Sequence, residues 1–256
     1  MPGQLERIRE KELLTIRCLM PRASRILEIG GGSGFQANLM HSWGHTVNSI
    51  DIAARSQAPQ KYYPVAEYDG VNIPFADASF DIVFSSNVLE HVRDLERIFK
   101  EIRRVMKANG IAVHILPTPS WRLWTSLMHY PYHLVRLFGS LFIPGRISKA
   151  VEQTAKDGTK SSGTQNARSL LNRILVSGPH GEYPSAASEL WYFSKMRWLR
   201  IFNDNGFELL THYPVRLFYT GYSSLPWLPM RLRTLLSFIL GSSGRVFVMR
   251  TRLAGR

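Results

Sequence analysis

The sequence predicts an α/β fold, in which a mostly parallel sheet carries helices on both faces. The first observation is an apolar segment, residues 26–29, that runs directly into the glycine-rich turn of residues 30–34. The second is the order of the next two segments, because a helix-like segment and then an apolar segment ending in Asp51 complete the pattern of a βαβ unit. The third is that strand-like and helix-like segments continue to alternate as far as residue 117.

Each element is expected from a local pattern. Residues 3–20 place apolar side chains at helical spacing and are expected to form an amphipathic helix that covers the sheet. Asp94 is the expected N-cap of a helix that Asn109 and Gly110 should end. The other expected elements are strands at 25–29, 46–51, 80–85, 111–116, 207–211 and 246–250, and helices at 35–42 and 189–203.

Length and composition favour one large domain with insertions. The 256 residues divide, in this prediction, into an N-terminal helix (1–21), a core (22–117), an insertion or lid (118–188) and a C-terminal part of the core with a second apolar insertion (189–256). Cys18 is the only cysteine, which excludes an intramolecular disulfide and a cysteine-based zinc site. The charged start of the chain lacks the apolar stretch of a secretory signal, so a cytoplasmic location is expected.

Positive charge is concentrated in the second half of the chain. Residues 1–117 hold 14 Lys and Arg against 13 Asp and Glu, whereas residues 118–256 hold 18 against 6, which gives net charges of +1 and +12. The second half also holds five of the six Trp. Such a surface favours an anionic, partly apolar partner, and peripheral contact with a membrane surface is expected rather than a membrane-spanning helix.

The glycine-rich turn predicts a nucleotide-type cofactor site. Glycine lets a ligand approach the backbone, and a helix starting at Phe35 would point its free N–H groups at that ligand. The run GxGxxA from Gly32 fits the dinucleotide pattern, with Asp51 near the distance expected for a ribose carboxylate. The run ExGxGxG from Glu28 instead resembles motif I of the class I S-adenosylmethionine-dependent methyltransferases. A sharp turn without a ligand is the third interpretation.

The stretch DGVNIPFADASFDIVFSSNVLEHVRDLERIFKEIRRVMKANGIAVHILP, residues 69–117, resembles the second half of the methyltransferase fold. The family in question includes the ubiquinone and menaquinone biosynthesis methyltransferases, and the resemblance covers residues 22–117. It implies a Rossmann-like, seven-stranded, mostly parallel sheet with an antiparallel last strand, helices on both faces and inserted helices on the substrate side. It also implies S-adenosylmethionine as the cofactor. Gly70 and the pair Ser86-Asn87 depart from the residues common in the family.

The resemblance also implies a set of cofactor-binding residues. Gly30, Gly32 and Gly34 would pass under the methionine and ribose, while Glu28 would orient the turn and reach the cofactor's amino group. The two oxygens of Asp51 match the two ribose hydroxyls. Turn bracing is the alternative for Glu28, and helix capping for Asp51. The full predicted set is Glu28, Gly30, Gly32, Gly34, Asp51, Ile52, Asp69, Gly70, Ser86 and Asn87, with Asp69 accepting the adenine amino group unless it only braces a turn.

Two histidines are candidates for a general base. His91 follows Glu90 near the cofactor, and an imidazole can hold a proton near neutral pH. His180 lies at the end of the insertion with Glu182 and Tyr183, and would contact the substrate if the insertion folds over the cofactor. Bracing a helix or loop is the alternative for both, because displacement at a sulfonium depends mainly on positioning. Glu90 and His91 form a single pair without a second ligand cluster, so no metal site is expected.

These observations predict an S-adenosylmethionine-dependent methyltransferase that acts on an amphiphilic or anionic small molecule, such as a lipid, a quinone precursor or a lipid-linked sugar. An RNA methyltransferase is the alternative, but nucleic acid is the less favoured partner because the basic residues are dispersed through apolar helices. A nicotinamide-dependent oxidoreductase fits the glycine pattern but would leave Asp69 and the segment around Pro74-Phe75 unexplained. A cofactor-binding protein without catalysis is the fourth class.

Overall fold

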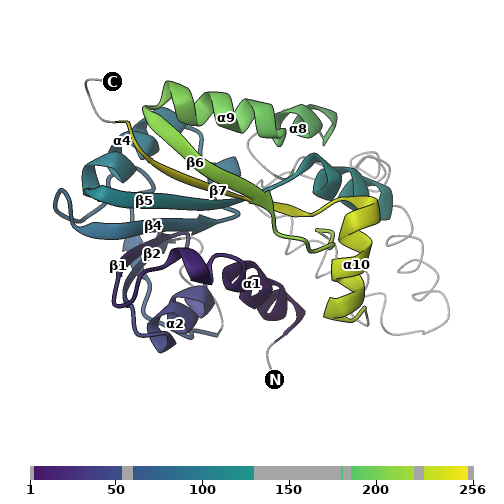
Figure 1. Ribbon diagram of the computed structural model, residues 1–256, viewed down its shortest axis with the longest axis horizontal. Helices are drawn as coiled ribbons and strands as arrows, with labels where there is room; N and C mark the ends of the chain where they lie inside the picture. The colour runs from purple at the N-terminus through teal and green to yellow at the C-terminus, as the bar shows by residue number, and fades with distance from the viewer. Residues whose placement is uncertain (1–2, 54–59, 130–179, 181–185, 222–227, 253–256) are drawn as a thin grey trace, which may run out of the picture.

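In the computed structural model, seven strands form one mixed sheet with helices on both faces (Figure 1). The structure describes residues 3–53, 60–129, 180, 186–221 and 228–252, so most of the predicted insertion lies outside the described residues. The strand order is β3-β2-β1-β4-β5-β7-β6. The strands are β1 (Arg25–Ile29), β2 (Thr46–Ile52), β3 (Ala66–Tyr68), β4 (Phe80–Ser86), β5 (Met106–Pro117), β6 (Phe207–Pro214) and β7 (Gly244–Thr251).

The direction of the strands confirms the predicted fold class. β1 pairs in parallel with β2 on one side and with β4 on the other, and β4 pairs in parallel with β5. β7 is antiparallel to both of its neighbours, β5 and β6. The order of the parallel strands reverses between β1 and β4, and ligands of such sheets bind at the carboxyl ends beside this point.

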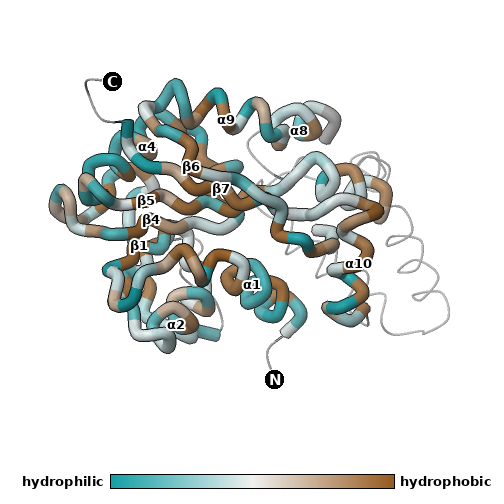
Figure 2. Tube along the Cα trace, in the orientation of Figure 1, coloured by the Kyte–Doolittle hydropathy of each residue, from teal (hydrophilic) through white to brown (hydrophobic). Residues whose placement is uncertain are grey.

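Helices cover the two faces of the sheet and give each face its own core. α1 and α2 pack on one face, with Leu13 and Met40 in the core, and α4 and α9 pack on the other, with Phe99 and Trp198. Figure 2 shows that apolar residues are concentrated along the central strands, which lie between the two layers of helices. The helices are α1 (Gln4–Leu14), α2 (Phe35–Ser42), α4 (Leu95–Val105), α8 (Ala186–Tyr192), α9 (Lys195–Asp204) and α10 (Met230–Leu240), with short 3-10 segments η1 (Arg17–Leu19) and η2 (Leu89–His91).

Two predicted helices are interrupted by hydroxyl side chains. The N-terminal helix ends at Leu14 and continues as η1, and the Thr15 hydroxyl bonds back to the carbonyl oxygen of Glu12 at 2.6 Å. The predicted helix over 189–203 is two helices, because Ser194 is extended and its side chain accepts a hydrogen bond from the Arg197 backbone N–H. A serine that caps a helix in this way favours a new start over continuation.

Helix α4 ends earlier than predicted, at Val105 rather than at Asn109 and Gly110. Met106 is already extended and pairs with Phe80, so it begins β5. The register then shifts before Ile111, which places Asn109 and Gly110 in an irregular part of the strand. The Asp94 cap is confirmed, since its side chain accepts a hydrogen bond from the Arg97 backbone N–H at 3.0 Å.

Candidate functional site

A cavity of about 490 Å³ opens at the carboxyl ends of β1, β2 and β4. Its volume is in the range usual for small-molecule sites. The glycine turn after β1, the end of β2 and the end of β4 are distant in sequence, and parallel pairing brings them to one edge of the sheet. Of the predicted site residues, the cavity is lined by Gly30, Gly32, Asp51, Ile52, Gly70, Ser86, Asn87 and His91.

The glycine turn brings bare backbone to the cavity at Gly32. This residue has φ +54°, and a Cβ atom built on it would meet no protein atom within 4 Å. Gly34 has a different role, because it precedes the first residue of α2 with φ +75° and a Cβ there would lie 2.6 Å from the carbonyl oxygen of Tyr63. Gly32 therefore faces open space that a ligand can use, whereas packing requires Gly34.

Asp51 holds the turn and still faces the cavity. Its Oδ2 accepts a hydrogen bond from the Gly32 backbone N–H at 2.8 Å, and its Oδ1 accepts one from Ile52 at 2.7 Å. Each carboxylate oxygen can accept a second hydrogen bond. The residue is 5% exposed and lines the cavity, so its carboxylate can accept hydrogen bonds from the hydroxyl groups of a ligand there.

Glu28 lies beneath the turn rather than in the cavity lining. Its carboxylate accepts a hydrogen bond from the Ser49 hydroxyl at 2.6 Å, and a Cβ on Gly31 would come within 2.8 Å of it. Burial is the main reason that the pKa of Glu28 rises to about 7, while the Ser49 bond acts in the opposite direction. These contacts show the turn-bracing role, and contact with a cofactor's amino group stays a prediction.

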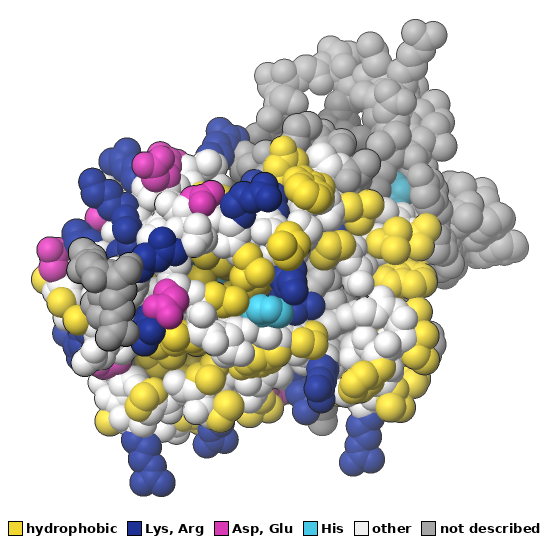
Figure 3. Space-filling view, turned by 45° about the horizontal axis from the view of Figure 1, so that its top comes forward, with side chains coloured by type: hydrophobic (Ala, Val, Ile, Leu, Met, Phe, Trp, Pro, Cys, Tyr) yellow, Lys and Arg dark blue, Asp and Glu magenta, His cyan; other side chains and the backbone are white. Residues whose placement is uncertain are grey.

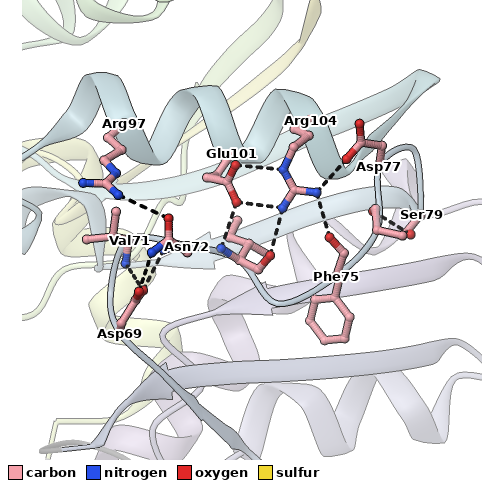
Figure 4. Close-up of polar contacts among 11 residues, drawn as sticks. Asp69, Val71, Asn72, Phe75, Asp77, Ser79, Arg97, Glu101 and Arg104 are labelled. Atoms are coloured by element: carbon pink, nitrogen blue, oxygen red, sulfur yellow. Dashed lines mark hydrogen bonds and ion pairs between the residues drawn. The ribbon is translucent and has the colours of Figure 1, made fainter.

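Asp69 also lies outside the cavity lining, and its carboxylate braces the next loop of the chain (Figure 4). It accepts hydrogen bonds from the backbone N–H groups of Asn72 and Val71 at 2.6 and 2.8 Å, and from the Asn72 side chain at 2.5 Å. The bonds from Asn72 and then Val71 lower the pKa of this exposed carboxyl. The structure therefore favours the turn-bracing alternative, and Gly70 and Val71 line the cavity beside it.

Arg104 fixes the same loop on α4 (Figure 4). Its guanidinium donates to the carbonyl oxygens of Ile73 and Phe75 at 2.9 and 2.7 Å. It also forms ion pairs with Asp77 and Glu101, each at 2.7 Å. Because Gly70 and Val71 belong to this loop, Arg104 holds one wall of the cavity in place.

The N-terminal helix forms another wall, which sequence reasoning missed. The lining residues from α1 are Leu5, Glu6 and Arg9. Arg9 pairs with the fully buried Glu12 at 2.6 Å, and Glu12 also accepts hydrogen bonds from the hydroxyls of Tyr219 at 2.5 Å and Ser86 at 3.3 Å. Helical spacing predicted that this segment would cover the sheet, but no local pattern says that it reaches the edge where the cavity opens.

The two predicted histidines meet beside the cavity. His91 lines it, and the ring centroids of His91 and His180 are 4.8 Å apart. The His180 backbone N–H donates to Glu189 at 2.6 Å, and its ring packs against Trp121 with centroids 4.6 Å apart. The predicted neighbours of His180, Glu182 and Tyr183, lie outside the described residues.

His180 also joins the pair that Glu90 and His91 form. The ligand atoms of the three side chains all lie within 4.8 Å of one another, and His91 Nε2 is 3.9 Å from the Glu90 carboxylate. The prediction that Glu90 and His91 form a single pair is wrong, because His180 is a third potential ligand beside them. The absence of a metal site stays a prediction. The sequence separation of His180 hides this proximity.

Residues 27–114 match the family described as methyltransferase domain, and this segment contains most of β1 to β5 and most of the cavity walls. Over 180 residues the chain is 29% identical to the biotin biosynthesis bifunctional protein BioHC of Cellvibrio japonicus, covering 65% of this chain and 36% of that protein. Over 95 residues it is 30% identical to the malonyl-(acyl-carrier protein) O-methyltransferase of Legionella pneumophila, covering 34% of each chain. The chain thus spans about a third of the length of both relatives.

The fold has solved counterparts. The crystal structure of an S-adenosylmethionine-dependent methyltransferase from Mesorhizobium loti matches with a TM-score of 0.53, covering 94% of this chain and 97% of that chain at 16% identity. The likeness is one of fold. The narrower resemblance to the ubiquinone and menaquinone enzymes stays a prediction.

Proposed function

We propose that this chain, whose residues 27–114 form a methyltransferase domain of the class I S-adenosylmethionine-dependent type, transfers a methyl group from that cofactor to a small molecule. The supporting observation is the cavity in which the open backbone of Gly32 lies beside the Asp51 carboxylate. A glycine leaves room for the methionine and ribose of the cofactor to lie against the backbone, and a carboxylate accepts hydrogen bonds from the ribose hydroxyls. Gly30, Ile52, Gly70 and Val71 complete this proposed cofactor side.

The acceptor side is proposed at the end of β4. Asn87 has φ +55°, which is uncommon for a non-glycine residue, and its backbone N–H donates to the carbonyl oxygen of Ile115 at 2.8 Å. Its side chain donates to the Ser86 hydroxyl at 3.0 Å. Bound S-adenosylmethionine would supply a methyl group on a positively charged sulfur. Ser86 and Asn87, which the sequence predicts as cofactor contacts, would lie between the cofactor and the acceptor and help to position both. His91 and His180 would orient the acceptor or take a proton from it.

The proposed acceptor is amphiphilic or anionic, such as a lipid, a quinone precursor or a lipid-linked sugar. Apolar side chains and Lys or Arg lie side by side on one face of the molecule (Figure 3). The described helices include none with the length and hydropathy to cross a membrane. A cytoplasmic location with peripheral membrane contact is part of this proposal, and its support is the mixed apolar and basic surface. Residues 119–129 are also helical, and the exposed large apolar residues of this segment and of α10 are Leu123, Leu127, Leu232, Leu235, Phe238 and Ile239.

Two measurements test the proposed function. Calorimetry should show binding of S-adenosylhomocysteine at micromolar concentration and no binding of NAD, and the reverse result would favour an oxidoreductase. Incubation with tritium-labelled S-adenosylmethionine should then label the lipid fraction of a cell extract. Label found only in RNA would support the alternative RNA methyltransferase, and cofactor binding without any transfer would leave a binding protein.

A further inference from the structure

A second hollow, of about 550 Å³, lies at the same edge of the sheet, where β5 and β6 end and β7 begins. We call it the basic groove, defined by Lys195 at the start of α9, Arg216 after β6 and Arg245 in β7. Among the described residues that line it there is no Asp or Glu. The hydroxyl groups in its lining belong to Thr118, Ser120, Ser194, Ser237 and Ser242.

The positive charge of the basic groove is uncompensated within the described part of the chain. There, no carboxylate lies within ion-pair distance of Lys195, Arg216 or Arg245. Arg245 instead donates to His212 Nδ1 at 3.0 Å. Burial, followed by the charges of Arg245 and Lys195, lowers the pKa of His212, which favours the neutral ring that accepts this hydrogen bond. Three neighbouring cations without a counter-charge favour an external anion.

Arg216 is placed at the groove by an unusual backbone conformation. Its φ of +57° lies in the left-handed region, which a long side chain rarely adopts. Its backbone N–H donates to the Ser242 hydroxyl at 3.1 Å, and its guanidinium lies 5.6 Å from the ring centroid of Phe238. The cation is therefore held between the groove and α10.

The α10 helix presents apolar side chains next to these cations. Leu235, Phe238 and Ile239 are 63%, 65% and 82% exposed, and Phe238 also lines the groove. An 11-residue helix of this kind suits the plane of a membrane interface. Phe238 could stack on a base, but Leu235 and Ile239 could not, so RNA would leave most of this apolar face unused.

We propose that the basic groove binds the phosphate headgroup of an anionic phospholipid at a membrane surface, with the apolar face of α10 inserted among the acyl chains. This inference rests on the peripheral contact proposed above and is independent of methyl transfer. The cofactor cavity and the basic groove open at the same edge of the sheet, so an amphiphilic acceptor could enter from the membrane.

The experiment is co-sedimentation of the full chain with phosphatidylcholine vesicles, with and without phosphatidylglycerol. The full chain should bind the anionic vesicles more tightly. Each Lys or Arg near such a surface contributes about fivefold, so the double variant Lys195→Gln/Arg216→Gln should bind them about 30-fold more weakly. Arg103→Gln/Arg200→Gln, which removes the same charge at two exposed positions outside the groove, is the matched control and should weaken binding by less than about fivefold. The variant Leu235→Ser/Ile239→Ser should lose binding to both vesicle types.

Binding of S-adenosylhomocysteine shows that each variant is folded. If the natural chain does not bind this ligand, the circular dichroism spectrum serves the same purpose, so a failure of the methyltransferase proposal would not affect the vesicle result. Equal binding of the full chain to neutral and anionic vesicles would overturn the phosphate assignment. Retention of anionic-vesicle binding by the double charge variant would do the same. Micromolar binding of inorganic phosphate without vesicle binding would assign the groove to a soluble ligand, and tighter binding of an RNA oligomer than of vesicles would assign it to nucleic acid.

Discussion

Gly32 and Gly44 share a left-handed backbone and open surroundings, but only Gly32 lies in the cavity. An alanine at either position should cost about 1 kcal/mol of stability, because its Cβ is unfavourable at positive φ. Gly32→Ala should also weaken S-adenosylhomocysteine binding by about tenfold or more, since the new methyl group occupies ligand space. Titration calorimetry on both variants measures this difference. Equal affinities of Gly32→Ala and Gly44→Ala would show that the ligand does not pass over Gly32.

Glu28 should make stability depend on pH. Its pKa rises from an ordinary 4.5 to about 7 in the folded protein, so the folded state holds a proton that the unfolded state releases. The resulting stabilisation is full below about pH 4.5 and is lost as the pH rises through about 7, by up to about 3 kcal/mol. Urea unfolding at several pH values should therefore show that the free energy of unfolding of the natural chain falls, relative to that of Glu28→Gln, as the pH rises.

Ser49→Ala is the control for the Glu28 measurement. The Ser49 hydroxyl donates to Glu28 and lowers its pKa, so removing it should extend the loss of stability to higher pH. A constant difference between the natural chain and Glu28→Gln from about pH 4.5 to about pH 8 would mean that Glu28 is ionised throughout this range.

At the scale of elements, one arginine of α4 holds the loop after β3. Arg104→Met removes two bonds to carbonyl oxygens and two ion pairs, and should lower the free energy of unfolding by about 2 kcal/mol. It should also weaken S-adenosylhomocysteine binding, because Gly70 and Val71 lose their support. Chemical unfolding and calorimetry measure the two effects.

The adjacent Arg103 provides a matched control on the same helix. Its side chain is exposed, and Arg103→Met should change stability by no more than about 0.5 kcal/mol. If the two variants were equally stable and bound S-adenosylhomocysteine equally well, the loop would be held by its own turn, including the bonds that Asp69 accepts.

The elements also show where local patterns fail. Strands with unbroken apolar runs were predicted within a few residues, because their side chains are buried on both faces. Helix limits were less accurate, since Ser194 could either continue a helix or cap a new one. Met106 is apolar and suits a helix or a strand, and pairing with Phe80 decides between them. Such choices depend on partners that are distant in sequence.

At the scale of the molecule, charge asymmetry should separate the two binding activities. The net charge of +12 on residues 118–256 acts over the Debye length, which is about 10 Å at 0.1 M salt and about 3 Å at 1 M. Binding to anionic vesicles should therefore fall steeply as the salt concentration rises. Affinity for S-adenosylhomocysteine should change by less than about twofold, because its cavity lies in the nearly neutral part of the chain.

Sedimentation and calorimetry over the same salt series check this expectation. Vesicle binding that does not respond to salt would assign the contact to the apolar face of α10 alone. A parallel fall of both affinities would indicate that the cofactor cavity shares the field of the basic groove.

The sequence by itself determined six of the seven strands, the glycine turn and the acid near the end of β2, because burial and left-handed backbone restrict residue choice locally. Tertiary structure alone decided which carboxylates face the cavity: Asp51 lines it, whereas Glu28 and Asp69 brace turns. It also decided that α1 reaches the cavity and that His180 meets His91. The physical reason is that the direction of a polar side chain follows from hydrogen-bond partners elsewhere in the chain, and these become neighbours only when the chain folds.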